Sequence, residues 1–169
     1  MPLIIIILFG ILSASFSLFI ELIAFSLSML SGSLSSAFSP FAFEGTFSAM
    51  TLFSLLGVAL IEETSKYIFL RQYALRYLRE MSTSVRGALL LGTLFGLGFA
   101  SLETFLTVQT GIGTPVFSLF GTAGIHIVTS LIFASYLLRF SRRPFLAPGL
   151  IATTVVLHTL YNIAVFFFL

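Results

Sequence analysis

Five long apolar segments follow one another along this 169-residue chain, and shorter polar stretches separate them. A helix that crosses a bilayer needs about 20 consecutive, mostly apolar residues, so each segment is long enough for one crossing. The pattern predicts spans over about residues 3–30, 47–70, 85–108, 116–138 and 150–169. No internal repeat or second domain is apparent. We therefore predict an all-α polytopic membrane bundle, a single transmembrane domain of about five helices.

The composition supports a protein of the lipid bilayer. The chain is 58% hydrophobic and 8% charged, and its mean hydropathy of +1.13 excludes an ordinary soluble domain. Cysteine and aspartate are both absent, which excludes disulfides, thiolate nucleophiles, cysteine metal sites and paired-aspartate chemistry. The pI near 9.3 reflects arginines at membrane edges, so no nucleic-acid partner is expected.

The arginines predict how the protein lies in the membrane. All seven fall in two polar stretches, between the second and third spans and between the fourth and fifth: Arg71, Arg76, Arg79 and Arg86, then Arg139, Arg142 and Arg143. Loops rich in Lys and Arg stay in the cytoplasm. We expect a cytoplasmic N-terminus and an external C-terminus. The Ser-rich stretch from Ser31 to Thr46 and the turn at Gly111–Pro115 are then external.

Ionisable residues within the predicted spans form four short motifs, one on each of spans two to five. A charged side chain in mid-bilayer costs about 2.5–3.5 kcal/mol on insertion scales, so such residues mark a functional site. In a helix, residues three or four apart share a face, which places Glu62 beside Lys66 with Glu63 also in reach. The motifs are EExxK at Glu62, Glu63 and Lys66, FxxxE at Phe99 and Glu103, His126 with Ser130, and His158 with Asn162.

Depth in the membrane tests whether these motifs can meet. With a rise of 1.5 Å per residue, Glu62, His158 and His126 lie about 20, 18 and 15 Å below the outer surface. Glu103 is shallower, at about 8 Å, and needs a tilted helix to approach the others. Gly92, Gly96 and Ala100 form a stripe of small residues that lets another helix pack closely against the third span. Glu21 matches no motif and is expected at the membrane interface or facing a pore.

Taken together, the four motifs resemble the PrsW family of intramembrane proteases, which is related to the CAAX prenyl protease (CPBP) group. The prenyl proteases usually show EExxxR and FxxxH, so Lys66 and Glu103 place this chain on the PrsW side. The resemblance covers about Leu56 to Asn162. It implies an intramembrane endopeptidase that hydrolyses peptide bonds of membrane-anchored protein substrates.

Peptide hydrolysis requires an activated water, a proton donor and a group that stabilises the oxyanion. We assign Glu62 as the leading general base and Glu63 as a second carboxylate that holds Lys66. His158 and Asn162 would orient the water or bind the oxyanion. His126 would share that role or position Glu103. The candidate catalytic residues are therefore Glu62, Glu63, Glu103, His126, His158 and Asn162, with Lys66, Phe99 and Ser130 in support.

Two alternatives use the same residues. Glu62, Glu103, His126 and His158 are also suitable ligands for Zn²⁺ or another divalent metal, although metal-free glutamate catalysis is the preferred mechanism from sequence. The polar pocket could instead belong to a non-catalytic membrane scaffold or chaperone, or to a small proton-coupled transporter. A scaffold does not need water-activating groups. A transporter more often shows repeated halves or helix breaks at mid-membrane.

Overall fold

The computed structural model of the chain describes residues 3–31, 49–77, 84–109, 116–140 and 146–168. Five helices account for nearly all of this part, in line with the predicted all-α fold: α1 (Leu3–Ser31), α2 (Ala49–Tyr77), α3 (Val85–Gln109), α4 (Val116–Phe140) and α5 (Ala147–Phe168). The predicted external loop and turn lie outside the described residues. So do Arg79, Arg142 and Arg143, and the side chain of Arg76.

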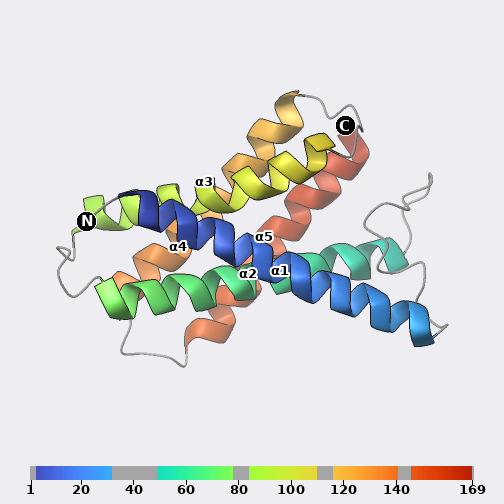
Figure 1. The fold of residues 1–169 in the computed structure, drawn as a ribbon, viewed down its shortest axis with the longest axis horizontal. Helices are drawn as coiled ribbons and strands as arrows, with labels where there is room; N and C mark the ends of the chain where they lie inside the picture. Colours follow the sequence, from blue (N-terminus) through green and yellow to red (C-terminus); the bar gives the residue numbers. More distant parts are fainter. Residues whose placement is uncertain (1–2, 32–48, 78–83, 110–115, 141–145, 169) are drawn as a thin grey trace.

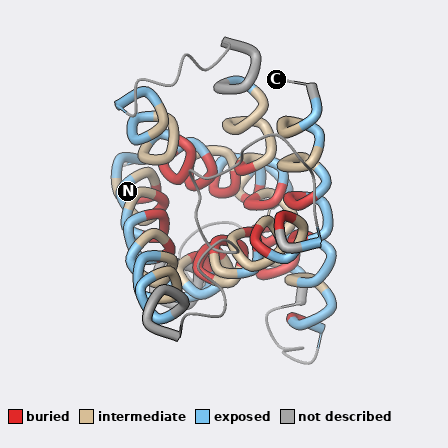
Figure 2. The backbone as a smooth tube through the Cα atoms, turned by 90° about the vertical axis from the view of Figure 1, so that its right-hand side faces the viewer, coloured by how far each residue is buried: buried red, intermediate tan, exposed pale blue. Residues whose placement is uncertain are grey.

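Four of the described helices, α1, α3, α4 and α5, are long and apolar enough to cross a membrane. Many positions on these helices are exposed (Figure 2), and large apolar side chains occupy many of them. The protein is therefore an integral membrane protein. Helix α2 is as long as α1, but Glu62, Glu63 and Lys66 make it too polar to be identified as a span from composition alone. A fifth crossing by α2 stays a prediction.

Helix α3 is at the centre of the packing. It contacts α4 and α1 most extensively, while α2 packs against α1 and α5 (Figure 1). The expected stripe of small residues makes the contact with α4. A Cβ added at Gly92 or Gly96 would lie 2.6 Å from the Cα of Leu131 or Ile127, so no side chain fits there. Gly98 meets the α1 backbone at Ile7 in the same way. These close approaches set the positions of α1 and α4 relative to α3.

Apolar side chains fill the half of the bundle where α1 begins and where α2 and α4 end. The buried cluster consists of Ile6, Leu70, Leu91, Phe95, Phe133, Ala134, Tyr136 and Leu137. The buried polar residues of the four motifs come next along each helix, toward the middle of the bundle. The candidate site therefore has a packed apolar floor on one side.

Candidate active site

Each of the four predicted motifs contributes at least one side chain to a single cluster. Glu62, Glu63 and Lys66 come from α2, Glu103 from α3, His126 from α4 and His158 from α5. Four of these six side chains are at most 2% exposed: Glu63, Lys66, His126 and His158. Burial of so many ionisable groups requires that they be paired with one another. The contacts show how the pairing is achieved.

Glu63 is the hub of the cluster. Its Oε1 accepts hydrogen bonds from Lys66 Nζ at 2.5 Å, His158 Nδ1 at 2.8 Å and Thr129 Oγ1 at 3.3 Å. Lys66 Nζ also donates to Thr129 Oγ1 at 3.1 Å. The buried ammonium is thus neutralised and held by two helices at once. We conclude that Glu63 and Lys66 hold the other groups in place.

Phe99 packs against both Lys66 of the ion pair and His126 of α4. Its ring centroid lies 4.6 Å from Lys66 Nζ, a cation–π distance, and 4.6 Å from the ring centroid of His126. Phe99 therefore supports the cluster by packing, the supporting position that the FxxxE motif predicted for it.

His126 is paired with Glu103. Its Nε2 is hydrogen-bonded to Glu103 Oε2, and its Nδ1 has no hydrogen-bond partner among the described residues. The sequence placed Glu103 well above His126 in the membrane. In the structure α3 is inclined relative to α1 and α2 (Figure 1), and it packs extensively against α4. This arrangement brings Glu103 of the FxxxE motif into contact with His126.

Glu62 faces the two imidazoles without being held by them. Its Oε2 lies 3.5 Å from His158 Nε2 and has no hydrogen-bond partner among the described residues. The rings of His126 and His158 lie edge to face, with centroids 5.1 Å apart. One potential ligand atom from each of Glu62, His126 and His158 lies within 4.8 Å of the other two. These three side chains therefore surround one small space.

The donor set of these three residues fits a divalent metal ion. Nδ1 of His158 and Nε2 of His126 are each hydrogen-bonded to a carboxylate, which leaves the opposite ring nitrogen of each histidine available as a ligand. Metal-binding histidines in proteins are usually oriented in this way by a carboxylate. Two imidazoles and one carboxylate are a common ligand set of catalytic zinc. Glu103 was predicted as a fourth ligand, but in the structure its Oε2 contacts His126.

A cavity of about 60 Å³ reaches the cluster from between α1, α2 and α3. Glu62 and Glu103 line it, together with Phe99, whereas Glu63 and Lys66 do not. A space of this size holds at least one water molecule, which needs about 10–15 Å³. Water can therefore reach Glu62 and Glu103, while the Glu63–Lys66 pair is sealed behind them.

Glu21 of α1 also lines this cavity, on the side facing Glu62 and Glu103. From the sequence, this residue was expected at the membrane interface or facing a pore, because it matches no motif, and no part in the site was predicted for it. A signal was nevertheless present. Gly10, Ala14, Ser17 and Glu21 recur every three or four residues, so they share one face of α1, and this face packs inward.

Two other predicted residues make no hydrogen bond to the cluster in the part of the chain that the structure describes. Ser130 Oγ is buried without a hydrogen-bond partner among the described residues, and its neighbour Thr129 makes the contacts with the cluster. Thr129 was not predicted as a site residue, because a threonine three residues after a histidine (HxxT) is not a recognised catalytic or metal-binding motif. Asn162 is half-buried on α5, and the structure records no hydrogen bond between it and the cluster. Its predicted role in binding the oxyanion gains no support from these contacts.

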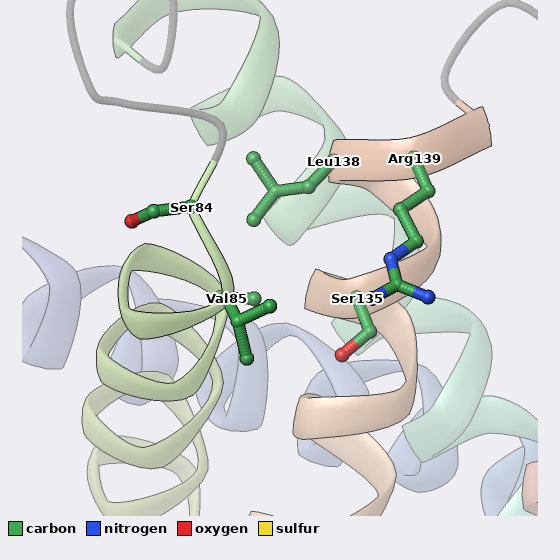
Figure 3. Close-up of a pocket in the computed structure, with 6 residues that line it drawn as sticks. Ser84, Val85, Ser135, Leu138 and Arg139 are labelled. Carbon is green, nitrogen blue, oxygen red and sulfur yellow. The ribbon is translucent and has the colours of Figure 1, made fainter.

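The other described cavity has a different character. It measures about 110 Å³ and lies between the start of α3 and the end of α4 (Figure 3). Its lining is formed by Ser84, Val85, Ala88, Ser135, Leu138 and Arg139. Arg139 is its only ionisable residue, so it contains no carboxylate or imidazole for hydrolytic chemistry. The polar cluster in mid-bundle is therefore the candidate active site.

Comparison with known proteins adds one finding. The model of a protein family described as PrsW family intramembrane metalloprotease matches residues 2–169, which is almost the whole chain. Comparison with curated proteins and with solved structures found no match. The matched region contains all four motifs and every side chain of the cluster.

Proposed function

The chain belongs to the PrsW family of intramembrane metalloproteases, and from this premise we propose that the cluster hydrolyses peptide bonds of membrane-anchored substrates. One observation carries the proposal. Glu62, whose buried Oε2 has no hydrogen-bond partner among the described residues, and the two histidines each place one potential ligand atom within 4.8 Å of the others, beside a cavity that Glu62 lines. The Oε2 atoms of Glu62 and Glu63 are both buried without a hydrogen-bond partner among the described residues, but of the two glutamates only Glu62 lines the cavity, so its free oxygen is the one that can meet water or substrate there.

Glu62, His126 and His158 would hold a divalent metal, with Zn²⁺ as the ion that best suits this ligand set. Such an ion supplies Lewis-acid chemistry: it polarises a peptide carbonyl and lowers the pKa of bound water to about 7. The metal-free mechanism was preferred from sequence. We now favour the metal because the structure leaves three ligand atoms close together and gives each histidine a carboxylate partner.

The remaining residues of the cluster orient those ligands. Glu63 Oε1 accepts a hydrogen bond from the Nδ1–H of His158, so the imidazole presents Nε2 toward Glu62. Glu103 holds the Nε2 side of His126 and leaves Nδ1 available. Lys66 and Thr129 keep Glu63 ionised and fixed. Each of these contacts reduces the freedom of a ligand before substrate arrives, which is how an active site lowers the reaction barrier.

We assign proton transfer to Glu103, because it lines the cavity and is not one of the three proposed metal ligands. The side chain of Glu103 is 38% exposed and lines the cavity, so it can accept a proton from the attacking water. The same group then returns the proton to the nitrogen of the leaving amine. The products are a carboxylate and an amine, and no other reactant is consumed.

A second mechanism uses Glu62 itself as the base. Its unpartnered Oε2 lies at the cavity and 3.5 Å from His158 Nε2, so it could accept the water proton without a metal. In this version His158 and His126 stabilise the developing oxyanion only as imidazolium ions, because the single N–H of each neutral ring is already donated to Glu63 or Glu103. Both mechanisms require Glu62, and they differ in whether purified protein contains metal.

A cleavage assay tests the proposal. Wild-type protein in lipid vesicles would be incubated with a panel of single-span peptides, and fragments would be identified by mass spectrometry. We expect cleavage by the wild type and a loss of at least about 100-fold in Glu62→Gln, Glu103→Gln and His158→Ala. Ser15→Ala, on an exposed position of α1, is the control for insertion. Near-normal turnover by Glu62→Gln would contradict the proposed site.

A further inference from the structure

The cavity at the active site extends along α1, the one helix that carries no family motif. Its α1 wall consists of Ala14, Ser17, Leu18 and Glu21, and the opposite wall on α3 includes Leu102 and Leu106. The two walls advance from Glu62 and Phe99 toward the end of the bundle opposite the apolar floor. A substrate that reaches Glu62 through this cavity therefore passes between α1 and α3.

The ionisable side chains along this passage are all acidic. Glu21, Glu62 and Glu103 line it, and none of the basic residues that the structure describes is among the lining residues. The structure records no ion pair for Glu21 with any described side chain, and Lys66 is occupied by Glu63. The Glu62 side chain is 91% buried and its Oε2 has no partner, so an unsatisfied acceptor faces the same space. The ionisable groups of the cavity are thus all carboxyl groups, and the hydroxyl of Ser17 in its wall donates to the Ala14 carbonyl oxygen.

We propose that the cavity between α1 and α3 is the substrate-binding cleft and that Glu21 is a specificity-determining residue, which binds a basic side chain of the substrate. This proposal rests on the proposed function, because it assigns a role to Glu21 in the same cleavage. The chemical class of substrate is a membrane-anchored segment with a Lys or Arg close to the cleaved bond. Apolar side chains of the segment would pack on Leu18, Leu102 and Leu106.

Physical chemistry favours a cation at Glu21. A carboxylate in a low-dielectric wall gains most from a partner of opposite charge, and a charge-assisted hydrogen bond in such a place is stronger than a neutral one. The apolar residues of the cleft suit a transmembrane segment, but they do not distinguish one apolar sequence from another. The Glu21 carboxylate can distinguish between substrate sequences, because Glu62 and Glu103 already have proposed roles in peptide-bond hydrolysis.

The test uses a series of synthetic 30-residue single-span peptides of Leu and Ala. In each peptide a single Lys takes a different position along the segment, and a matched peptide carries Leu there. The readout is the ratio of kcat/KM for the Lys peptide to that for the Leu peptide. We expect a ratio of about 10 to 100 at one or two positions, the range that a charge-assisted hydrogen bond provides. Glu21→Gln should reduce this ratio to near one, while Ser15→Ala should not change it.

A charge exchange separates recognition from a structural role. Glu21→Lys should prefer a peptide with Glu at the selected position over the Lys peptide, which a merely destabilised protein would not do. Binding provides a second measurement without catalysis. In Glu62→Gln, the affinity for the fluorescently labelled Lys peptide should fall about 10- to 100-fold when Glu21→Gln is added.

The outcomes distinguish the two proposals. If the wild type cleaves the peptides but Glu21→Gln leaves every Lys-to-Leu ratio unchanged, the role of Glu21 is wrong and the proposed function stands. If no peptide is cleaved but the affinity for the Lys peptide depends on Glu21, the cleft binds cations and the proposed function is wrong. If neither the cleavage ratio nor the affinity depends on Glu21, the proposed role of Glu21 is overturned.

Discussion

His158 Nδ1 lies 2.8 Å from Oε1 of Glu63, and this hydrogen bond connects α5 to α2 in the interior of the bundle. The same oxygen accepts the Lys66 ammonium. One carboxylate therefore neutralises a buried cation and fixes the ring of a candidate metal ligand. The neighbouring Glu62 takes no part in this pairing, although it is adjacent in sequence and also buried.

The two adjacent glutamates should consequently differ in what their loss does. Glu63→Gln leaves the Lys66 ammonium buried without a counter-charge, and breaking a buried ion pair in this way costs about 3–5 kcal/mol of stability. Glu62→Gln loses only a 3.5 Å contact with His158, so the unfolding free energy should stay within about 1 kcal/mol of wild type. It should nevertheless abolish cleavage, because both proposed mechanisms require the Glu62 carboxylate. Unfolding in mixed detergent micelles would measure both. Equal destabilisation by the two substitutions would contradict the assigned roles.

Metal content distinguishes the two mechanisms. We expect about one divalent metal ion per chain in purified wild-type protein by elemental analysis, and its loss in His158→Ala. A chelator should abolish cleavage, and added Zn²⁺ should restore it. The control is Ser15→Ala, which should bind metal as the wild type does. Full activity of a preparation without metal would instead support Glu62 acting directly on water.

Thr129 and Ser130 form a matched pair on α4. The Thr129 hydroxyl accepts from Lys66 and donates to Glu63, so Thr129→Val, which keeps the shape of the side chain, should cost about 1–3 kcal/mol of stability. Ser130→Ala removes a buried hydroxyl without a described partner and should change stability by less than about 0.5 kcal/mol. Thermal unfolding in detergent would compare them. A larger effect at Ser130 would show that its hydroxyl makes a hydrogen bond when the protein is folded.

Gly96 and Gly124 test the packing that positions His126. A Cβ at Gly96 would lie 2.7 Å from the His126 carbonyl oxygen, so Gly96→Ala forces α3 and α4 apart. We expect a loss of about 1–3 kcal/mol in stability and reduced cleavage. Gly124→Ala, on α4, meets nothing within 4 Å and should be tolerated or slightly stabilising, because alanine favours helix. Similar effects of the two substitutions would argue against close α3–α4 packing.

The orientation in the membrane is tested by reporter fusions. The start of α1 and the end of α5 lie at opposite ends of the bundle, as an odd number of crossings requires (Figure 1). Reporters at Arg79 and Arg142 should be cytoplasmic, and a reporter after Leu169 should be external. A cytoplasmic reporter at Leu169 would mean that α2 does not cross the membrane.

Much of the candidate site could be recognised in the sequence because the membrane makes polar residues conspicuous. A bilayer core leaves few reasons to keep Glu62, Lys66, His126 or His158 inside an apolar segment, so their positions alone indicated a site. Helical periodicity likewise placed Glu62 and Glu63 within reach of Lys66. The helices themselves followed from length and hydropathy, since a backbone in lipid must satisfy its own hydrogen bonds.

The tertiary structure decided which of these residues meet. Lys66 could have paired with either glutamate, and it pairs with Glu63 because Thr129 and His158, from two other helices, converge on that carboxylate. Glu103 reaches His126 because α3 is inclined, and no pattern along the chain encodes a crossing angle. Glu21 enters the cavity because the face of small residues that carries it packs against the neighbouring helices. Sequence determined the inventory of buried polar groups, whereas packing between helices determined their partners, because contacts between distant segments depend on how whole helices are arranged.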